Sequence, residues 1–217
     1  MRLLSDLRPI TSKRTTLSDL MRAWLKGALD PIGEFLVRLG LTPNGMTLLG
    51  FLGTAIAGIV IARGQLVLGG ILVLFTAPLD TLDGAMARAR GAPTAFGGFI
   101  DSVTDRYTEL FLFGGILYHF LVQDDHLGSL LAFAAAGGSL LVSYAKARAE
   151  AAGFDAHIGL LSRFERFLIL IPSLITQQLV IGLGVIAVLS NVTAIQRILH
   201  VSAQARLPTA PKRGGHQ

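Results

Sequence analysis

Five long runs without a charged residue limit what this chain can fold into. They cover residues 39–62, 64–79, 110–123, 127–145 and 167–196. About 20 apolar residues are enough for a helix to cross a lipid bilayer. In a 217-residue chain that is 52% hydrophobic and 15% charged, such runs predict an all-α, polytopic membrane protein. The same composition excludes a disordered chain and disfavours a water-soluble enzyme.

Basic residues alternate with these runs and predict the number of spans. Lys and Arg gather before the first run, after the second and fourth, and at the end of the chain. The loops near residues 64–65, 123–125 and 177–178 contain almost no basic residue except Arg63. Because basic loops stay in the cytoplasm, both termini lie there and the number of spans is even. We expect six transmembrane helices, with the last run divided near Gln177–Gln178 and its fifth helix beginning before Phe167.

The two ends of the chain differ from this bundle. Residues 1–30 are basic, with apolar residues at helical spacing, and predict an interfacial amphipathic helix; an ordinary packed helix is the alternative. Residues 39–201 form the expected six-helix bundle, so that residues 1–201 make one membrane domain. Residues 202–217 contain two Pro and two Gly, and we expect a disordered cytoplasmic tail.

The formal net charge is +5. In a membrane protein this charge is explained by basic loops that face anionic lipid, so no nucleic-acid partner is expected. The chain contains no cysteine, which excludes disulfides and thiolate metal ligands. We expect a multi-pass protein of a prokaryotic plasma membrane whose termini and active site are cytoplasmic.

Acidic residues inside membrane segments are costly and usually functional. Four aspartates fall on two adjacent, antiparallel helices near their cytoplasmic ends: Asp80, Asp83, Asp101 and Asp105. Their spacings of three and four place each pair on one helix face. Facing carboxylates need cations between them, and oxygen ligands suit Mg²⁺ or Mn²⁺, so we predict a two-metal site. The alternative is a structural role, with salt bridges to Arg88, Arg90 and Arg106.

Small residues accompany the first acidic pair. Gly84 and Ala87 share its face and leave room for a ligand against the backbone. Arg88 adds a planar set of donors suited to a phosphate group. A metal-bound diphosphate is therefore the predicted ligand.

The whole pattern reads Asp80-x-x-Asp83-Gly84-x-x-Ala87-Arg88, then eight residues, then Gly97-x-x-x-Asp101-x-x-x-Asp105. It resembles the signature of the CDP-alcohol phosphotransferases, also called CDP-alcohol phosphatidyltransferases. The resemblance implies a homodimer of six-span subunits. It also implies transfer of a phosphatidyl group from a CDP-linked lipid, such as CDP-diacylglycerol, to the hydroxyl of a small polar alcohol, with release of CMP.

The resemblance implies a role for each residue of the pattern. Two metal ions would be bound by Asp80, Asp83, Asp101 and Asp105. Asp105 would also act as the general base on the acceptor hydroxyl. Contacts to the CDP-lipid would come from Asn44, Thr47, Gly84, Ala87, Arg88 and Thr94.

A basic cluster is expected at the cytoplasmic mouth of the site. Its members are Lys146, Arg163 and Arg166, and Arg197 would join them. Such a cluster suits a phosphate carried by the acceptor. The run resembles the phosphatidylinositol-phosphate synthase branch, which uses inositol 1-phosphate. Glycerol 3-phosphate, the acceptor of phosphatidylglycerophosphate synthases, is the near alternative, and the positive-inside rule alone explains the same charges.

Two other protein classes also place acids within membranes. A membrane prenyl-diphosphate aromatic transferase has two acidic motifs that lie far apart in sequence, whereas here they lie on adjacent helices. A transporter predicts broken helices or inverted repeats, and the sequence has neither. Metal-dependent release of CMP separates the transferase from both alternatives.

Overall fold

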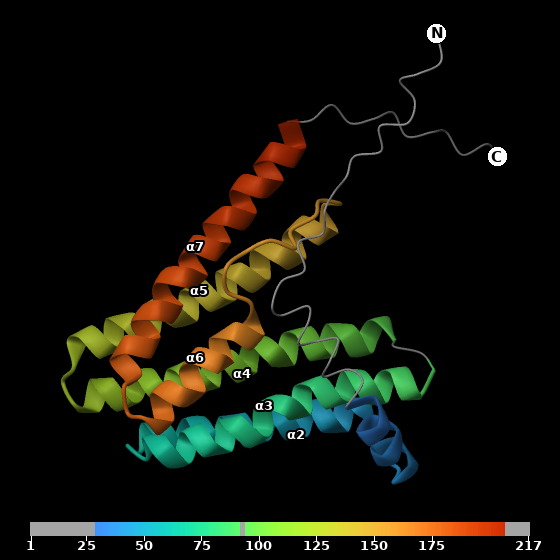
Figure 1. Cartoon of the computed structure of the whole chain (residues 1–217), viewed down its shortest axis with the longest axis horizontal. Coiled ribbons are helices and arrows are strands. Elements are labelled where there is room, and N and C mark those ends of the chain that lie inside the picture. Colours follow the sequence, from blue (N-terminus) through green and yellow to red (C-terminus); the bar gives the residue numbers. More distant parts are fainter. Residues whose placement is uncertain (1–28, 92–93, 207–217) are drawn as a thin grey trace.

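The computed structural model describes residues 29–91 and 94–206, and all regular elements in these ranges are helices (Figure 1). Residues 29–38 are helical, and six labelled helices follow: α2 (Pro43–Ala62), α3 (Leu66–Ala89), α4 (Ala95–Val122), α5 (His126–Ala151), α6 (Arg163–Ile175) and α7 (Leu179–Arg206). The predicted all-α class is confirmed. Most of the expected interfacial helix, at residues 1–28, lies outside the described residues, as do residues 207–217.

Side-chain caps fix the N-termini of α2 and α4. The Oγ1 atom of Thr42 accepts a hydrogen bond from the backbone N–H of Gly45 at 3.1 Å, and Pro43 occupies the first turn of α2. Thr94 does the same for Gly97 at 3.0 Å. These caps satisfy backbone donors that the first helical turn leaves unpaired.

The last uncharged run is divided into two helices, as predicted. α6 begins at Arg163, before Phe167, and ends at Ile175. Gln177 has φ of 60°, which reverses the chain between α6 and α7. α7 continues to Arg206. Residues 202–206 are therefore helical, and the expected disordered tail does not begin at residue 202.

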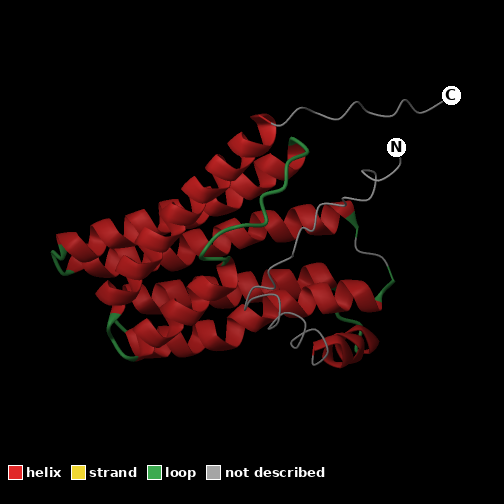
Figure 2. Ribbon diagram, turned by 45° about the horizontal axis from the view of Figure 1, so that its top comes forward, coloured by secondary structure: helices red, strands yellow, loops and turns green. Residues whose placement is uncertain are grey.

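The six labelled helices form a closed ring of neighbours. α2 packs against α3 and α4, α4 against α5, α5 against α7, α7 against α6, and α6 back against α3. The buried apolar core takes residues from every one of these helices. Figure 2 shows short connections between them, apart from the longer segment between α5 and α6. The ring brings α6 beside α3 although 73 residues separate Ala89 from Arg163 in the chain.

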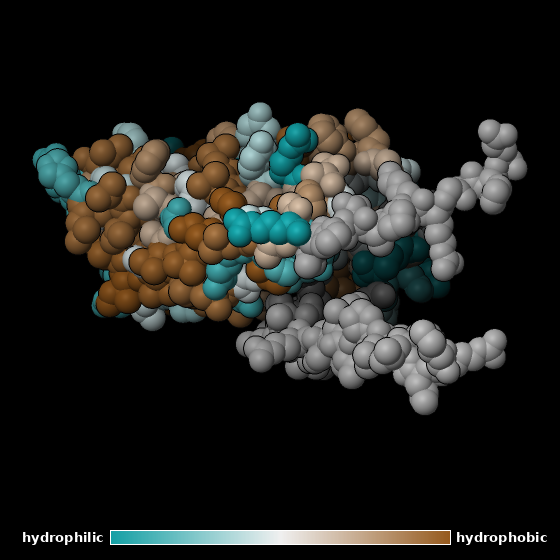
Figure 3. Space-filling view, turned by 90° about the horizontal axis from the view of Figure 1, so that it is seen from above, coloured by the Kyte–Doolittle hydropathy of each residue, from teal (hydrophilic) through white to brown (hydrophobic). Residues whose placement is uncertain are grey.

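The outer surface of the bundle is apolar. Hydrophobic side chains predominate on the coloured part of the face in Figure 3. Large exposed examples include Phe75, Phe133 and Ile181, each at least 65% exposed. Four helices are long and apolar enough to cross a bilayer: α2, α3, α5 and α7. The chain is therefore a membrane protein.

The two remaining helices differ from those four. α6 has only 13 residues. α4 has 28 residues but carries a row of charged residues in its first half: Asp101, Asp105, Arg106 and Glu109. The six-span topology consequently remains a prediction for α4 and α6.

Glycine allows α2 and α4 to approach each other closely. A Cβ atom on Gly58 would lie 2.6 Å from the carbonyl oxygen of Phe111, which is far inside van der Waals contact. Small residues have this role in membrane helix pairs, where association depends on close packing of backbones. The approach matters for the site because α4 carries half of the acidic residues.

Gly58→Ala should therefore lower the free energy of unfolding in detergent by about 1–3 kcal/mol, the usual cost of overpacking. Gly137→Ala is the matched control, because a Cβ there would meet nothing within 4 Å among the described residues. The free energy of unfolding of Gly137→Ala should be unchanged or slightly higher, because Ala favours a helix more than Gly does. Equal thermal unfolding midpoints for the two variants would contradict the close α2–α4 contact.

Candidate active site

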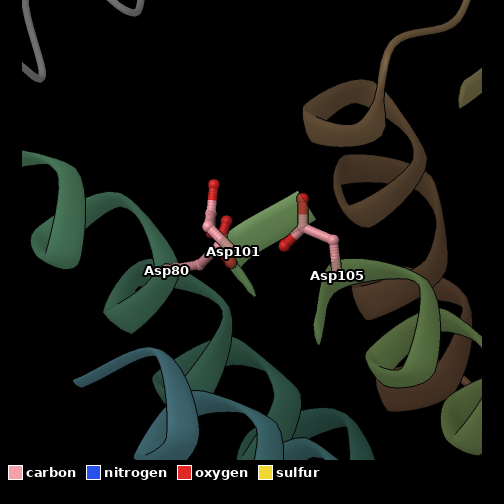
Figure 4. A group of neighbouring side chains, drawn as sticks. All are labelled: Asp80, Asp101 and Asp105. Atoms are coloured by element: carbon pink, nitrogen blue, oxygen red, sulfur yellow. The ribbon is translucent and has the colours of Figure 1, made fainter. Parts of the chain in front are cut away.

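Three of the four predicted metal ligands gather in one place. Asp80 projects from α3, and Asp101 and Asp105 project from successive turns of α4 (Figure 4). Each offers one carboxylate oxygen, and these oxygens all lie within 4.8 Å of one another. All three residues are partly buried. The spacing of four on α4 and the adjacency of the two helices produce this cluster, as the sequence predicted.

Asp83 lies one turn along α3 and is more deeply buried, at 6% exposure. Its Oδ2 atom accepts a hydrogen bond from the Oγ1 atom of Thr47 at 2.5 Å. Thr47 belongs to the first turns of α2, so this bond joins α2 to α3 beside the carboxylate cluster. The structure thus places Thr47, a predicted nucleotide contact, directly on a predicted metal ligand.

The cluster's principal ion-pair partner comes from α6. The Nη1 atom of Arg163 lies 2.6 Å from Oδ2 of Asp80 and also contacts Oδ1 of Asp105. Arg106 is a weaker partner, with its Nη1 atom 3.6 Å from Oδ2 of Asp105. The sequence had placed Arg163 among acceptor contacts, and the structure brings it into direct contact with the acidic residues.

The alternative of structural salt bridges gains little support from the arginines named for it. Arg88 pairs with Asp30 at 2.7 Å, and Arg90 donates to the backbone oxygen of Leu41 at 2.8 Å. Only Arg106 of the three contacts an aspartate of the cluster among the described residues. The ion pairs of Asp80 and Asp105 come mainly from Arg163, and Asp101 has no ion pair in the described part of the chain.

Glu109 is a charged residue of the site that the sequence analysis missed. It lies four residues after Asp105 and is only 3% exposed. Its Oε1 atom lies 2.5 Å from Nη2 of Arg166, which is also 3% exposed, and 3.7 Å from Nε of Arg163. The signal was present, because Asp101, Asp105 and Glu109 continue one stripe at intervals of four.

The other two predicted acceptor contacts are held by their own partners. Arg197 donates from Nε to the backbone oxygen of Ile158 at 2.9 Å and from Nη1 to that of Val142 at 2.5 Å. Lys146 pairs with Glu150 at 3.7 Å, near the surface. Arg197 and Arg166 lie close enough for their charges to repel. The structure thus gathers three arginines, with Lys146 nearer the exposed end of α5.

The segment that delivers Arg163 is anchored to α7. The Oγ1 atom of Thr193 accepts hydrogen bonds from the backbone N–H groups of Leu160 and Leu161, at 3.2 and 3.1 Å. Further along α7, the side chain of Gln204 accepts from the N–H of Asp155 at 3.0 Å and donates to its carbonyl oxygen. These bonds fix the segment between α5 and α6 and hence the start of α6.

The residues predicted to contact the CDP-lipid lie at the start of α2, the end of α3 and the approach to α4. A Cβ atom on Gly84 would meet only the Arg88 side chain, at 3.6 Å, within the described chain. Space for a ligand is therefore open beside the backbone at Gly84, as predicted. Asn44 and Thr94 approach Gly97, where an added Cβ would lie 3.7 and 3.0 Å from their side-chain oxygens. Ala87 is half-buried on α3.

The donor set fits a hard divalent cation. Carboxylate oxygens are the preferred ligands of Mg²⁺ and Mn²⁺, and three of them already converge here. The Arg163 guanidinium contacts two of the same carboxylates, Asp80 and Asp105, so it and a cation would share these ligands.

The helical membrane bundle places a carboxylate cluster suited to a divalent metal beside arginines and beside free space at Gly84. This combination is typical of a membrane enzyme that acts on phosphate esters. The chain belongs to the CDP-alcohol phosphatidyltransferase family, whose model matches residues 40–203. It is a metal-dependent transferase of substituted phosphate groups, as the sequence predicted.

Relatives across much of the chain share this family. An archaetidylinositol phosphate synthase of Pyrococcus horikoshii is 39% identical over 179 residues, covering 82% of this chain and 93% of the relative. A phosphatidylinositol phosphate synthase of Mycobacterium marinum is 32% identical over 210 residues, covering 89% and 90%.

Solved structures of the phosphatidylinositol phosphate synthase of Mycobacterium tuberculosis have the same fold. The structure with CDP-DAG bound has a TM-score of 0.74 at 32% identity and covers 87% of this chain and 98% of that one. The complex with manganese and citrate has a TM-score of 0.75 at 31% identity and covers 87% and 93%.

Binding of a divalent metal should stabilise the protein through this cluster. MnCl₂ at about 100 times its dissociation constant should raise the thermal unfolding midpoint by about 5–10 °C, following the mass-action relation. Asp101→Asn should abolish most of this shift because it removes one converging carboxylate. Asp124→Asn, in the turn between α4 and α5, is the control and should keep the full shift; an unchanged shift in Asp101→Asn would remove Asp101 as a ligand.

Proposed function

We propose that this protein transfers the phosphatidyl group of a CDP-linked lipid, such as CDP-diacylglycerol, to inositol 1-phosphate. One observation carries the choice of acceptor: Arg163 reaches the carboxylate cluster from α6, with Arg166 buried one turn away. A guanidinium beside the reacting centre suits an acceptor that brings its own phosphate. The relatives named phosphatidylinositol and archaetidylinositol phosphate synthases support the same acceptor class.

Divalent metal, Mg²⁺ or Mn²⁺, would supply charge neutralisation for the diphosphate and the leaving phosphate. We propose two ions per site, held by Asp80, Asp83, Asp101 and Asp105. Asp83 would have to share its carboxylate between a metal and the Thr47 hydroxyl. A carboxylate has two oxygens with several lone pairs, so both partners are compatible with one side chain.

The chemical step is a substitution at the lipid-side phosphorus. The acceptor hydroxyl oxygen forms a new bond to this phosphorus while the bond to the CMP oxygen breaks. Asp105 accepts the hydroxyl proton, and CMP leaves with the electron pair of the broken bond. We assign this role to Asp105 because it faces α6, from which the acceptor would be held, as well as the other carboxylates.

The CDP moiety would lie at the cytoplasmic ends of α2, α3 and α4. Its proposed contacts are Asn44, Thr47, Gly84, Ala87, Arg88 and Thr94. The open space beside Gly84 supports this placement. Arg88 would exchange its partner Asp30, at 2.7 Å, for a phosphate oxygen of the ligand.

The acceptor phosphate would lie between α5, α6 and α7, and its proposed ligands are Lys146, Arg163, Arg166 and Arg197. Arg166 keeps a buried Nη1 atom without a hydrogen-bond partner among the described residues. Arg197 is oriented by two backbone carbonyl groups. Donors that are fixed before a ligand arrives lose little entropy on binding.

We extend the proposal to the whole assembly. Residues 1–201 would act as one domain, with six spans, cytoplasmic termini and a cytoplasmic active site, and two copies would form a homodimer. The apolar surface of α2, α3, α5 and α7 supports the membrane placement, and the positive-inside charge pattern supports the orientation.

The experiment that tests the function is CMP release from CDP-diacylglycerol by purified protein with Mg²⁺ or Mn²⁺. Inositol 1-phosphate, glycerol 3-phosphate, inositol and serine are offered separately. We expect release with inositol 1-phosphate and little with unphosphorylated inositol. Release with glycerol 3-phosphate alone would identify a phosphatidylglycerophosphate synthase. Absence of release with every acceptor in folded protein would overturn the reaction and favour a transporter.

Asp105→Asn should lower kcat by a factor of at least about 100, because an amide cannot accept the acceptor proton. Binding of the CDP-lipid should change little, since the other carboxylates and the nucleotide contacts remain. CMP release and CDP-lipid binding are measured on the same preparation. Asp124→Asn serves again as the control, and near-normal turnover in Asp105→Asn would exclude Asp105 as the base.

A further inference from the structure

Glu109 extends the acidic stripe of α4 one turn beyond Asp105. Four residues of α-helix place it about 6 Å further along the axis. Unlike Asp80, Asp101 and Asp105, it is almost completely buried and lies outside their oxygen cluster. A buried carboxylate is costly unless a cation compensates it, so its partners define what it does.

Two arginines of α6 meet at the same Glu109 oxygen. The Oε1 atom lies 2.5 Å from Nη2 of Arg166 and 3.7 Å from Nε of Arg163. Arg163 directs its Nη1 atom away from Glu109, toward Asp80 and Asp105. Glu109 therefore contacts one guanidinium that touches the reacting centre and another that lies behind it.

The contact between Glu109 and Arg166 leaves one hydrogen-bonding atom of each side chain without a partner among the described residues. Nη1 of Arg166 and Oε2 of Glu109 are buried and have no hydrogen-bond partner among the described residues. Arg197 approaches Arg166 from α7. Arg163 is also paired with Asp80 and Asp105, but Arg166 has only Glu109 as an ion-pair partner, and Arg197 has none within 4 Å in the residues that the structure describes. The side of the group nearest α7 therefore has more positive than negative charge, which is the balance that a phosphate dianion requires.

We propose that Glu109 is a positioning residue that orients Arg163 and Arg166 toward the phosphate of the acceptor. This inference rests on the proposed transfer to a phosphorylated alcohol. Glu109 touches neither substrate; it acts by fixing the directions of two guanidinium groups. Without its charge, Arg166 loses its ionic hydrogen-bond partner, and Nε of Arg163 loses the negative charge that lies 3.7 Å away.

The matched variants are Glu109→Gln, which keeps the side-chain size and removes the charge, and Glu109→Asp, which keeps the charge but shortens the reach. CMP release is followed with inositol 1-phosphate and CDP-diacylglycerol varied in turn. We expect Glu109→Gln to raise KM for inositol 1-phosphate at least tenfold. KM for CDP-diacylglycerol should stay within twofold, and Glu109→Asp should recover part of the loss.

Glu34→Gln is the control for removal of a glutamate charge. Glu34 is exposed and pairs with Arg38 at 3.9 Å, and neither residue is among the predicted site residues. Both KM values should match those of the wild type. An equal rise of both KM values in Glu109→Gln, or none in either, would overturn the positioning role.

A folding defect is separated from positioning by a double variant. Glu109→Gln combined with Arg166→Gln removes both buried charges, which avoids leaving one of them unpaired. If Glu109 acts through Arg166 as well as Arg163, the double variant should raise KM for the acceptor by clearly less than the product of the two single-variant effects, because the part that acts through Arg166 is already lost. Multiplied effects would show that the two residues act independently and would overturn the proposal.

The wild-type measurement separates this proposal from the function on which it rests. If wild-type protein uses glycerol 3-phosphate instead, the same KM comparison is made with that acceptor, and a selective rise still supports Glu109. If the wild type releases CMP with unphosphorylated inositol as readily as with its phosphate, the acceptor-phosphate site fails, and the role of Glu109 fails with it.

Discussion

Charged groups inside an apolar bundle must be neutralised within the bundle, and the whole site follows from this constraint. Six acidic or basic side chains from α3, α4 and α6 meet in its interior: Asp80, Asp101, Asp105, Glu109, Arg163 and Arg166. Neither sign balances the other completely. Near α3, the three aspartates outnumber their arginine partners, Arg163 and the more weakly paired Arg106, which leaves negative charge for a divalent metal. Toward α7, Glu109 is paired with Arg166, and Arg197 adds a further positive charge, which is the basis of the proposed phosphate site. The charged groups that the fold does not neutralise are the ones available to bind metal and substrate.

The predicted metal and CDP-lipid contacts lie in one half of the helix ring, and the predicted acceptor contacts lie in the other. α3 and the first half of α4 carry the motif from Asp80 to Asp105, and the backbone at Gly84 is open beside it. α6 and α7, with the segment anchored by Thr193, carry the arginines that would decide which alcohol is used. The two halves meet at Arg163, which contacts the carboxylates Asp80 and Asp105 of the first half. This arrangement is consistent with one family name that covers transfer to different alcohols.

Much of this architecture could be predicted from residues close together in the sequence. Uncharged runs indicated the helices, and spacings of three and four placed Asp80, Asp101 and Asp105 on facing sides. Partners distant in sequence could not be predicted. The pairing of Arg88 with Asp30 spans 58 residues, and the bonds of Arg197 to two backbone carbonyls depend on how α5 and α7 pack. Glu109 could have been noticed because it continues the stripe of Asp101 and Asp105, but its pairing with Arg166, 57 residues away, could not be predicted.

The closure of the ring by α6 also imposes an order on biosynthesis. Chains emerge from the ribosome N-terminus first, so α2 to α5 enter the membrane before α6 exists. During that interval Asp80, Asp105 and Glu109 lack the arginines that neutralise them in the finished protein. The nascent bundle must keep these acids near water or protonated until α6 arrives. The acids of α3 and α4 consequently gain their arginine partners only after α6 has been made.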